Sequence, residues 1–508
     1  MKKSKKKINR RKFIATAGTT AATFSIVPSN VLGGKNHVPP SDKIHVAQIG
    51  CGTEGLWELP EVLENEQIQV THLVDVNKYT TDYLDWSSHR VINTIRKSIG
   101  NPDWGKYIKG IPGGRDIGEE YVNKYYAKHR SNPNYKAVKM YEDYREMLEK
   151  ETDIDAIKIM TPDHSHANIA LAGMKKGLHI MTHKPLSNRL REGMMVVNAA
   201  KKYDVKTHLL AWTDKPEYRL ILKWIKDGVI GNLKEIHNWS YRPVWPQFPR
   251  GPRQGLPIPD GFNWQLWLGP EKDRPYSPDY THNVFRGWYD FGGGSIADMG
   301  HYSIFPLFQE FGITRAPSSV RAYSSNAGRQ NVNGVSRPIV NNDAFPDACT
   351  IKFQFPYQNE TIPAFDFYWY DGGVRPFAPE ELEEDGLDTP TEGLMFIGDA
   401  GKILGGFRGE KPRIIPQKKM NAYQGEKPKP PAEREERSQD FVKSILSGEE
   451  SPGSFIYAGT VTEMINLGAA ALRAKKKLNY DSSTMTITNH ESANEYLKRD
   501  YREGWELH

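Results

Sequence analysis

A glycine-rich turn, followed at a set distance by an acidic residue, has the spacing of a dinucleotide-binding site. Residues 50–55 read G-C-G-T-E-G, a G-x-G-x-x-G pattern, and Asp75 lies 20 residues beyond Gly55. Gly50 allows a sharp turn, Gly52 removes a side chain that would hold a pyrophosphate away from backbone N–H groups, and Gly55 permits close packing of helix on strand. We therefore predict that this turn binds the pyrophosphate of a dinucleotide at the start of a helix.

The acidic residue indicates which dinucleotide is bound. A carboxylate at position 75 can accept hydrogen bonds from both ribose hydroxyls of the adenosine, and it would repel a 2′-phosphate, so NAD is favoured over NADP. The alternative is a glycine-rich turn without a ligand, because glycine patterns alone are common. The residues predicted to contact the cofactor here are Gly50, Cys51, Gly52, Thr53, Glu54, Gly55, Asp75 and Asn77.

Two further polar stretches follow predicted strands. Residues 161–166 read T-P-D-H-S-H directly after the apolar run 154–160, and the pair His183-Lys184 follows the run 178–182. Ligands bind at the carboxyl ends of parallel strands. The alternatives are a helix cap with surface histidines, or a metal held through H-x-H; with no further ligands nearby we predict no metal. The cofactor contacts predicted at this end are Thr161, Pro162, His164, His166, His183 and Lys184.

The elements that must position these residues read as alternating strands and helices. Short apolar runs at 44–49, 68–74, 154–160, 178–182 and 205–211 are typical of buried parallel strands, and 167–176 is typical of a helix ended by Gly177. The segment 87–139 is polar, rich in Tyr and interrupted by Pro and Gly, which predicts an insertion with short helices. The first part of the chain is therefore predicted to be an α/β domain of the dinucleotide-binding type.

These stretches together resemble the Gfo/Idh/MocA oxidoreductases. The resemblance covers most of residues 41–508, and it implies an N-terminal Rossmann domain at 41–213 and a C-terminal α+β domain at 214–508. The second domain is expected to have an open, mostly antiparallel sheet that holds substrate and forms homo-oligomers. The segments that carry the resemblance are 50–55, 161–166, Lys184-Pro185, 263–270, 274–276, 291–301, 441–468 and 501–505.

The resemblance also implies catalytic residues, with two departures from the family pattern. His183 stands where the family usually has Glu, and the histidine expected four residues after Asp298 is Tyr302, with His301 one position earlier. On an α-helix the third and fourth residues after an aspartate both face its side. His301 or Tyr302 is therefore predicted to act with Asp298 and Lys184.

Lys184 suits the role of base in the oxidation of a sugar alcohol. Such a reaction sends hydride to the nicotinamide while a base removes the hydroxyl proton, and positive charge on the oxidised cofactor would lower the pKa of a nearby lysine. The ammonium form could also stabilise charge on a carbonyl oxygen. Without the family pattern, Lys184 would read as a surface lysine at a turn and Asp298 as a helix cap.

Composition limits the other classes of function. The 508 residues carry a net charge of +6, but residues 1–12 hold eight Lys or Arg and no acid, which leaves 60 basic against 62 acidic residues. A nucleic-acid partner is therefore not predicted. The two cysteines exclude a disulfide framework.

Arg10-Arg11 before the short apolar run 13–27 predicts a twin-arginine export signal at 1–34, a periplasmic or otherwise exported protein, and no membrane span in the mature chain.

We therefore expect an exported NAD-dependent oxidoreductase that acts on a carbohydrate. Free NAD should be scarce outside the cytoplasm, so the cofactor is expected to be tightly bound and regenerated in place. An alternative is a redox-neutral glycosidase or lyase that oxidises a sugar carbon transiently. A second alternative is a sugar-binding protein without catalysis on the same fold.

Overall fold

The described part of the chain holds two sheets, each with its own helices. The computed structural model describes residues 42–85, 87–129, 137–245, 247, 250–282, 284–428 and 437–507. The predicted export signal at 1–34 lies outside the described residues. Among the described residues no helix is long and apolar enough to cross a membrane.

The first sheet has six parallel strands in the order β3-β2-β1-β4-β5-β6. This is the order of a doubly wound dinucleotide-binding fold, with its switch point beside β1. The prediction of a Rossmann domain is confirmed, because short apolar runs buried on both faces form parallel strands. The strands are β1 (Ile44–Ile49), β2 (Ile68–Val74), β3 (Lys139–Tyr141), β4 (Ala156–Ile159), β5 (His179–Thr182) and β6 (Thr207–Leu209).

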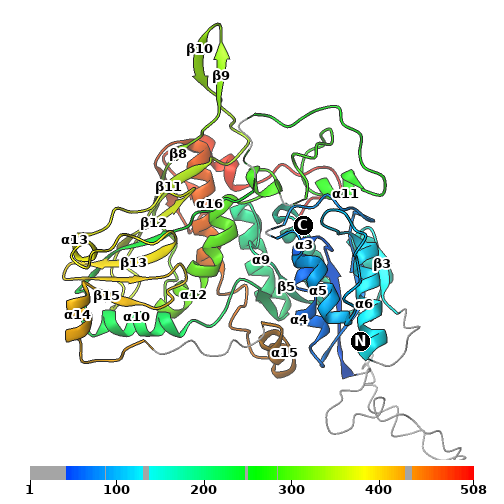
Figure 1. Cartoon of the computed structure of the whole chain (residues 1–508), viewed down its shortest axis with the longest axis horizontal. Coiled ribbons are helices and arrows are strands. Elements are labelled where there is room, and N and C mark those ends of the chain that lie inside the picture. The colour runs from blue at the N-terminus through cyan, green and yellow to red at the C-terminus, as the bar shows by residue number, and fades with distance from the viewer. Residues whose placement is uncertain are drawn as a thin grey trace, which may run out of the picture. The chain divides into compact units, whose positions relative to one another are not determined.

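The helices of this domain pack on both faces of the sheet (Figure 1). Two of them, of 10 and 15 residues, lie inside the segment 87–139, and the longer one leads towards the edge strand β3. The helix predicted at 167–176 spans His166–Lys175, and Gly177 follows with φ +78°. The helices are α3 (Thr53–Trp57), α4 (Pro60–Leu63), α5 (Arg90–Ile99), α6 (Arg115–His129), α7 (Tyr144–Lys150), α8 (His166–Lys175) and α9 (Leu190–Tyr203).

The second sheet has nine strands in the order β15-β14-β13-β7-β12-β11-β8-β16-β17. Only the central pair β7 and β12 is parallel, so the predicted mostly antiparallel sheet is confirmed. The strands are β7 (Leu233–Trp239), β8 (Ser319–Ser325), β11 (Ala348–Phe355), β12 (Phe365–Asp371), β13 (Gly393–Gly398), β14 (Lys402–Gly405), β15 (Arg413–Ile415), β16 (Leu478–Asp481) and β17 (Thr486–Ile487).

One apolar core joins the two sheets. Residues of β11 alternate between buried and half-buried, and the buried set faces helices that lie between the sheets (Figure 1). At 25 cal/mol per Å² or so of apolar surface, this shared burial favours one fixed arrangement of the two domains. The helices are α10 (Pro216–Lys226), α12 (His301–Phe311) and α16 (Gly459–Ala474).

The chain also returns to the first domain near its end. Helix α15 (Arg437–Ser447) contacts α4, and its residues Phe441 and Val442 are buried in the core of the first sheet.

The remaining elements are α11 (Trp264–Leu268), α13 (Glu380–Glu383), α14 (Gln417–Ala422), the hairpin β9 (Arg329–Val332) and β10 (Val335–Pro338), a π-helical turn at Ile296–Gly300, and 3-10 turns at Asp163–Ser165, Val284–Gly287 and Glu491–Leu497.

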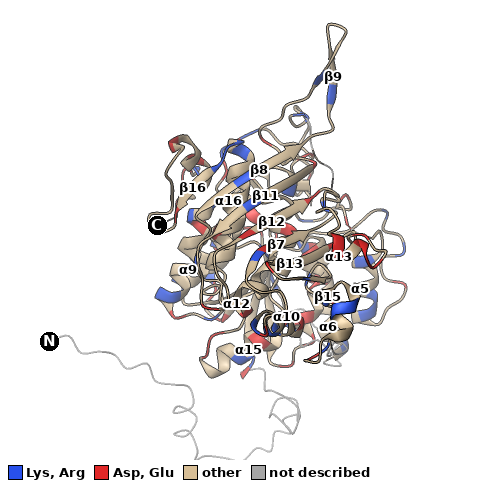
Figure 2. Ribbon diagram, turned by 90° about the vertical axis from the view of Figure 1, so that its left-hand side faces the viewer, with Lys and Arg blue, Asp and Glu red and all other residues tan. Residues whose placement is uncertain are grey.

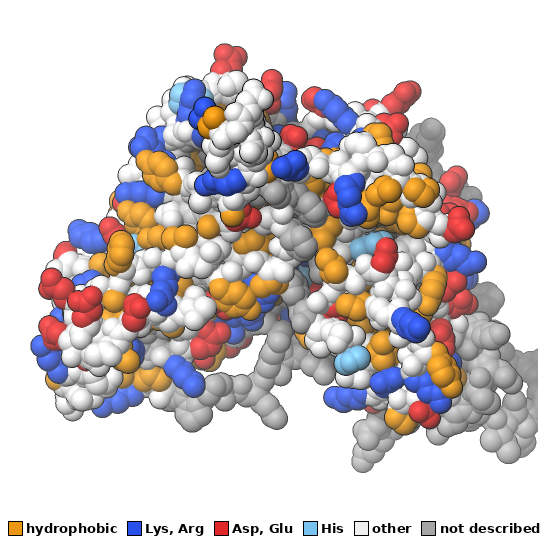
Figure 3. Space-filling model, turned by 45° about the horizontal axis from the view of Figure 1, so that its top comes forward, with side chains coloured by type: hydrophobic (Ala, Val, Ile, Leu, Met, Phe, Trp, Pro, Cys, Tyr) orange, Lys and Arg blue, Asp and Glu red, His pale blue; other side chains and the backbone are white. Residues whose placement is uncertain are grey.

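Charges of both signs are interspersed over the described surface. In Figure 2, Lys and Arg and Asp and Glu are scattered over the ribbon without a long stretch of one sign. On the face seen in Figure 3, basic, acidic and apolar side chains also alternate. Neither face carries the continuous basic stripe that binding of a nucleic-acid backbone requires.

Candidate active site

A pocket that opens to solvent lies at the carboxyl ends of β1, β2, β4 and β5. Its volume is about 1070 Å³ when the solvent-filled space at the opening is included. Side chains from the second half of the chain close it, among them Phe262, Trp267, Arg286 and Trp505. The pocket therefore lies at the place where doubly wound folds bind their ligands. Of the predicted cofactor contacts it is lined by Gly50, Gly52, Thr53, Glu54, Asp75, Asn77, Thr161, Pro162 and His183.

The glycine turn is shaped by close backbone contacts. Gly50 has φ +105°, and a Cβ atom there would stand 2.4 Å from the carbonyl oxygen of Met160. A Cβ atom on Gly55 would stand 2.3 Å from the carbonyl oxygen of Gly50. Neither position admits a side chain without movement of the backbone, which agrees with the roles predicted for both glycines.

The turn leaves donors for an anion at the pocket. Helix α3 begins at Thr53, and its N-cap Gly52 supplies no side-chain hydrogen bond. The first N–H groups of a helix lack partners within the helix, and Gly52, Thr53 and Glu54 all line the pocket. The residues present thus fit the pyrophosphate of NAD, with Glu54 held by Arg90 at 2.5 Å.

The Asp75 carboxylate accepts hydrogen bonds from two backbone N–H groups. One carboxylate oxygen accepts from the Cys51 N–H at 2.6 Å and the other from the Asn77 N–H at 2.7 Å. The carboxylate therefore ties the glycine turn to the end of β2, and its remaining lone pairs face the pocket for ribose hydroxyls. Burial raises the pKa of Asp75 to about 6, against the lowering effect of these two hydrogen bonds.

We expect the affinity for NAD to fall as the pH is lowered below about 6. Protonation of Asp75 removes an acceptor that the ribose hydroxyls need, and its raised pKa places that change at about pH 6. In the Asp75→Asn variant the affinity should be about 10- to 100-fold lower at pH 7.5, and the pH dependence should disappear. Calorimetric titration with NAD from pH 5 to pH 8 measures both effects.

A second buried aspartate serves as the control for that titration. Burial also raises the pKa of Asp371 to about 6, but this residue lies in β12 and accepts from the Cys349 N–H and the Trp369 indole. Asp371→Asn should leave the pH dependence of NAD binding in place. A break near pH 6 that persists in Asp75→Asn would refute the assignment.

Residues 161–166, the T-P-D-H-S-H stretch, support the pocket wall through buried hydrogen bonds. Asp163 is buried and joins the second half of the chain, with one oxygen 3.0 Å from Arg286 Nη1 and the other accepting from the Gly293 N–H at 3.0 Å. His164 Nε2 lies 2.8 Å from the carbonyl oxygen of Trp267. The ring nitrogens of His166 lie 2.6 and 2.8 Å from the carbonyl oxygens of Pro185 and Thr161.

These contacts change the part that the two histidines are expected to play. His164 and His166 are 0% and 1% exposed, and neither lines the pocket, whereas Thr161 and Pro162 do. The prediction of direct cofactor contact by these histidines is therefore corrected. They hold the backbone of the wall in place, because both ring nitrogens of His166 and the Nε2 of His164 lie within hydrogen-bond distance of main-chain carbonyl oxygens.

Lys184 and Asp298 form a buried ion pair directly behind the pocket. Lys184 Nζ donates to Asp298 Oδ1, and the two residues are 3% and 4% exposed. Arg286, which lines the pocket, places its Nε 3.6 Å from the same carboxylate oxygen. Residues 114 positions apart in the sequence thus meet where β5 ends.

Burial and the charges around this pair shift the pKa of both Lys184 and Asp298. Burial lowers the pKa of Lys184, and the Arg286 guanidinium lowers it further, against the attraction of Asp298. Burial alone would raise the pKa of Asp298, but the Lys184 and Arg286 cations outweigh it and hold that pKa below its usual range. A lysine whose pKa is lowered, beside an ionised carboxylate, is suited to give and take a proton.

The helix that carries Asp298 begins as a π turn. Residues Ile296–Gly300 are π-helical and α12 continues from His301, so one extra residue fits into the turn after Asp298. The expectation that the third and fourth residues share the face of the aspartate holds for an α-helix and is wrong here. The wider turn favours Tyr302 over His301 as the residue on that face.

The side-chain contacts also distinguish Tyr302 from His301. The ring of Tyr302 lies 5.4 Å from Lys184 Nζ, and its hydroxyl lies 3.1 Å from His183 Nε2. His301 is 0% exposed, and its Nδ1 lies 2.9 Å from the carbonyl oxygen of Ala297 within its own helix. Burial lowers the pKa of His301 to about 4.

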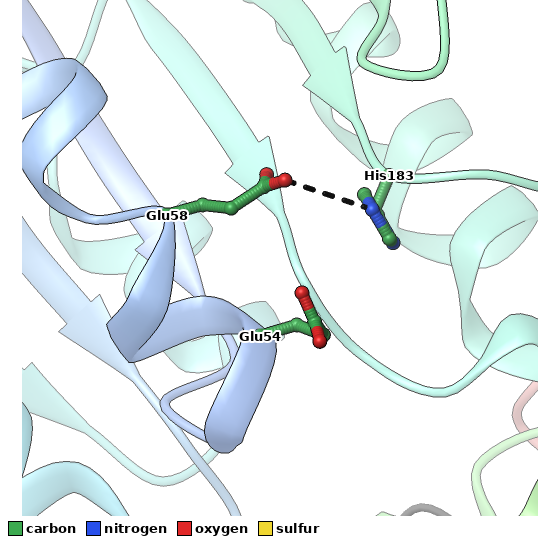
Figure 4. Close-up of side chains that lie close together, drawn as sticks. All are labelled: Glu54, Glu58 and His183. Atoms are coloured by element: carbon green, nitrogen blue, oxygen red, sulfur yellow. Dashed lines mark ion pairs between the residues drawn. The ribbon is translucent and has the colours of Figure 1, made fainter. Parts of the chain in front are cut away.

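His183 forms a cluster with two glutamates. Figure 4 shows Glu54 and Glu58 extending from the helix after the glycine turn toward His183, and one ligand atom from each lies within 4.8 Å of the others. Such a set could hold a cation, but Glu58 is 3.0 Å from the Arg437 guanidinium and Glu54 is paired with Arg90. The carboxylates are thus neutralised by the protein, and the cluster fixes His183 beside Tyr302.

Sequence reasoning missed several residues of the site. Arg286, Tyr83 and Arg437 belong to no motif recognised in the sequence, yet Arg286 and Tyr83 line the pocket and Arg437 pairs with Glu58. Trp267 lies in the recognised segment 263–270 but is not among the residues predicted to line the site. The ring of Tyr83 lies against Gly52, so close that a Cβ atom on that glycine would be 3.0 Å from the ring. A charged or aromatic residue in a loop gives no local signal of its long-range contacts.

Comparison with known proteins identifies related sequences in both halves. Residues 121–210 match a family model described as oxidoreductase family, NAD-binding Rossmann fold. Residues 221–362 and 381–507 match one described as oxidoreductase family, C-terminal alpha/beta domain. These descriptions agree with the two domains of the structure and with NAD as the cofactor.

Individual relatives match over shorter stretches. A levoglucosan dehydrogenase from Pseudarthrobacter phenanthrenivorans is 31% identical over 112 residues, which cover 22% of this chain and 28% of that protein. A glycosyl hydrolase family 109 protein from Shewanella baltica is 23% identical over 244 residues, which cover 44% of each. The chain thus spans less than half the length of these curated relatives.

A solved structure supports the fold. The WlbA dehydrogenase from Bordetella pertussis, in complex with NADH and UDP-GlcNAcA, superposes with a TM-score of 0.51 over 86% of this chain and 99% of that chain. The sequence identity is 12%, so this likeness concerns the fold alone.

Proposed function

Because the chain belongs to the Gfo/Idh/MocA oxidoreductase family, we propose that it transfers a hydride between a carbinol carbon of a sugar and the nicotinamide of bound NAD. The observation that carries this proposal is the buried Lys184–Asp298 pair at the edge of the NAD pocket, next to His183 and Arg286, which line that pocket. A sugar-binding protein without catalysis would have no need to bury a lysine and an aspartate there, since unpaired or paired buried charges cost stability.

In the proposed reaction the protein handles the proton. Lys184 takes the proton of the sugar hydroxyl, a role that its lowered pKa favours because less energy is needed to hold the amine neutral. Asp298 and Arg286 orient its Nζ. Tyr302, held by His183, positions the hydroxyl group. When bound, NAD supplies the hydride acceptor.

We also propose that the protein is exported and keeps its NAD during turnover. Arg10-Arg11 and the apolar run after them support export by the twin-arginine route, which carries folded proteins. An exported enzyme that released NADH would lack a supply of NAD, so a retained cofactor follows. We further expect the C-terminal domain to form homo-oligomers, as the family resemblance implies.

A redox-neutral glycosidase is a second candidate. The likeness to the glycosyl hydrolase family 109 protein over 44% of the chain favours it. In such a cycle a sugar carbon is oxidised, the glycosidic group leaves, and the carbon is reduced again. The protein groups described above would serve both the removal of the proton and its return.

One experiment separates the candidates. The purified full chain is denatured and its released ligand is identified by mass spectrometry, and the native protein is then incubated with a panel of sugars and aryl glycosides. We expect NAD(H) to be released in about equimolar amount with the chain. Oxidised sugar with NADH formed one for one supports the oxidoreductase, whereas aglycone release without net NADH supports the glycosidase. A chain that neither carries nor binds NAD would refute both.

A further inference from the structure

An arginine from the second sheet borders the reacting groups. Arg408 lies in the turn between β14 and β15, and its guanidinium carbon is 4.6 Å from the centre of the Tyr302 ring. Lys184 Nζ is 5.4 Å from the centre of the same ring. Tyr302 therefore has the proposed proton acceptor and a second cation as neighbours.

The turn that carries Arg408 is fixed by its flanking residues. Phe407 is 7% exposed, and its carbonyl oxygen accepts from Asn238 Nδ2 at 3.1 Å. Gly409 has φ +77°, and a Cβ atom there would stand 2.6 Å from the ring of Tyr218. Tyr218 in turn binds Ser303 of α12, next to Tyr302. The backbone on both sides of Arg408 is thus held in place, and its half-buried side chain lies against the Tyr302 ring.

The charges around Tyr302 leave this cation without a partner. Lys184 is paired with Asp298, Arg286 with Asp163 and Arg437 with Glu58. Among the described residues, no carboxylate is within ion-pair distance of the Arg408 guanidinium; Glu410 accepts from the backbone N–H of Arg408 instead. A fixed, half-buried guanidinium beside a catalytic tyrosine is suited to bind an oxyanion of the substrate, because its planar donors match such a group.

We propose that the sugar substrate carries an anionic group, a carboxylate or a sulfate or phosphate ester, and that Arg408 binds it next to Tyr302. This inference rests on the proposed function, because it assigns a substrate class to the same site. A neutral sugar would leave the guanidinium with water alone and would gain nothing from its fixed position. Arg408 is then a residue that determines specificity and takes no part in the proton transfer.

The test uses the NAD-loaded full chain and sets of sugars with matched stereochemistry. Each set holds a uronic acid, a 6-sulfated sugar, a 6-phosphorylated sugar and the neutral parent, in the gluco, galacto and manno series. Binding is measured by calorimetry and turnover by NADH formation. We expect one anionic member to bind at least 10-fold more tightly than its neutral parent, and Arg408→Met to remove this preference. Arg408→Lys should restore part of it, because a lysine keeps the charge without the planar donors.

Arg473→Met is the matched control. Arg473 stacks on Tyr496 at 4.4 Å in a similar contact, at the end of α16. Its loss should change stability alone and leave the preference for anionic sugars intact. Equal binding of neutral and anionic sugars, or a preference unchanged in Arg408→Met, would overturn the inference and leave the proposed function standing. Arg408-dependent binding of an anionic sugar without any hydride transfer would support the inference and refute the proposed function.

Discussion

Replacing Lys184 with methionine should lower kcat by about two to four orders of magnitude. Methionine keeps most of the volume but has no proton to give or take, while Asp298 keeps Arg286 as a neighbouring cation. The affinity for NAD should change little, because Lys184 lies behind the pocket wall. Single-turnover kinetics on the NAD-loaded protein, with a sugar found by the screen described above, measure the effect on the chemical step.

Lys206→Met provides the comparison for that variant. Lys206 is 8% exposed and is paired with Glu450 at 3.1 Å, so its loss removes another largely buried ion pair, one that has no contact with Lys184, Asp298 or Tyr302 among the described residues. The comparison variant should keep kcat within about twofold of the wild type, as an ion pair outside the site contributes to stability alone. If Lys184→Met turned the sugar over at the rate of Lys206→Met, the base would have to be another group.

Replacing Arg286 with methionine should move the pH profile of kcat/KM to higher pH and destabilise the fold. The Arg286 guanidinium lowers the pKa of Lys184, so its removal raises that pKa, and the acidic limb of the profile shifts upward because more of the lysine stays protonated. Asp163 also loses its only paired cation among the described residues. Removal of one partner of a buried pair costs about 3–5 kcal/mol of unfolding free energy.

Arg499→Met separates the two effects. Arg499 is equally buried and is paired with Glu192 and Glu271, so its loss should destabilise the fold by a similar amount. It should leave the position of the pH profile unchanged. Thermal unfolding and kcat/KM between pH 5 and pH 9 are measured for both variants; an unshifted profile in Arg286→Met would show that Lys184 is not the titrating base.

Much of the first domain could be predicted because its signals are local. The runs 44–49 and 68–74 match β1 and β2 to the residue, and the positive φ of Gly50 agrees with the turn that its position indicated. Strands buried on both faces consist of apolar residues, and turns of this type admit only glycine, so a short window of sequence carries the information.

The remainder of the site depends on contacts that no short window contains. The π turn at 296–300 changes which residue faces Asp298, and its residues are buried in the core that the two sheets share, where no local sequence pattern marked the extra residue. Arg286 is held at the site by its hydrogen bond to Asp163, which lies 123 residues away in the sequence. His164 and His166 read as ligand-binding residues from their spacing, yet long-range carbonyl contacts hold them behind the wall.

The account rests on hydride transfer within the pocket beside Lys184, and isotope transfer tests it most directly. The NAD-loaded protein is incubated with its sugar substrate deuterated at every ring carbon, and the released nicotinamide dinucleotide is weighed by mass spectrometry. We predict a gain of one deuterium in the cofactor for a net oxidation. In a redox-neutral cycle the deuteride returns to the sugar, so the labelled cofactor is expected only when the reaction is quenched within the first turnover. No labelled cofactor is expected within the same time for Lys184→Met. Oxidised sugar, or its oxidised intermediate, formed by the wild-type protein with an unlabelled cofactor would contradict hydride transfer to the nicotinamide.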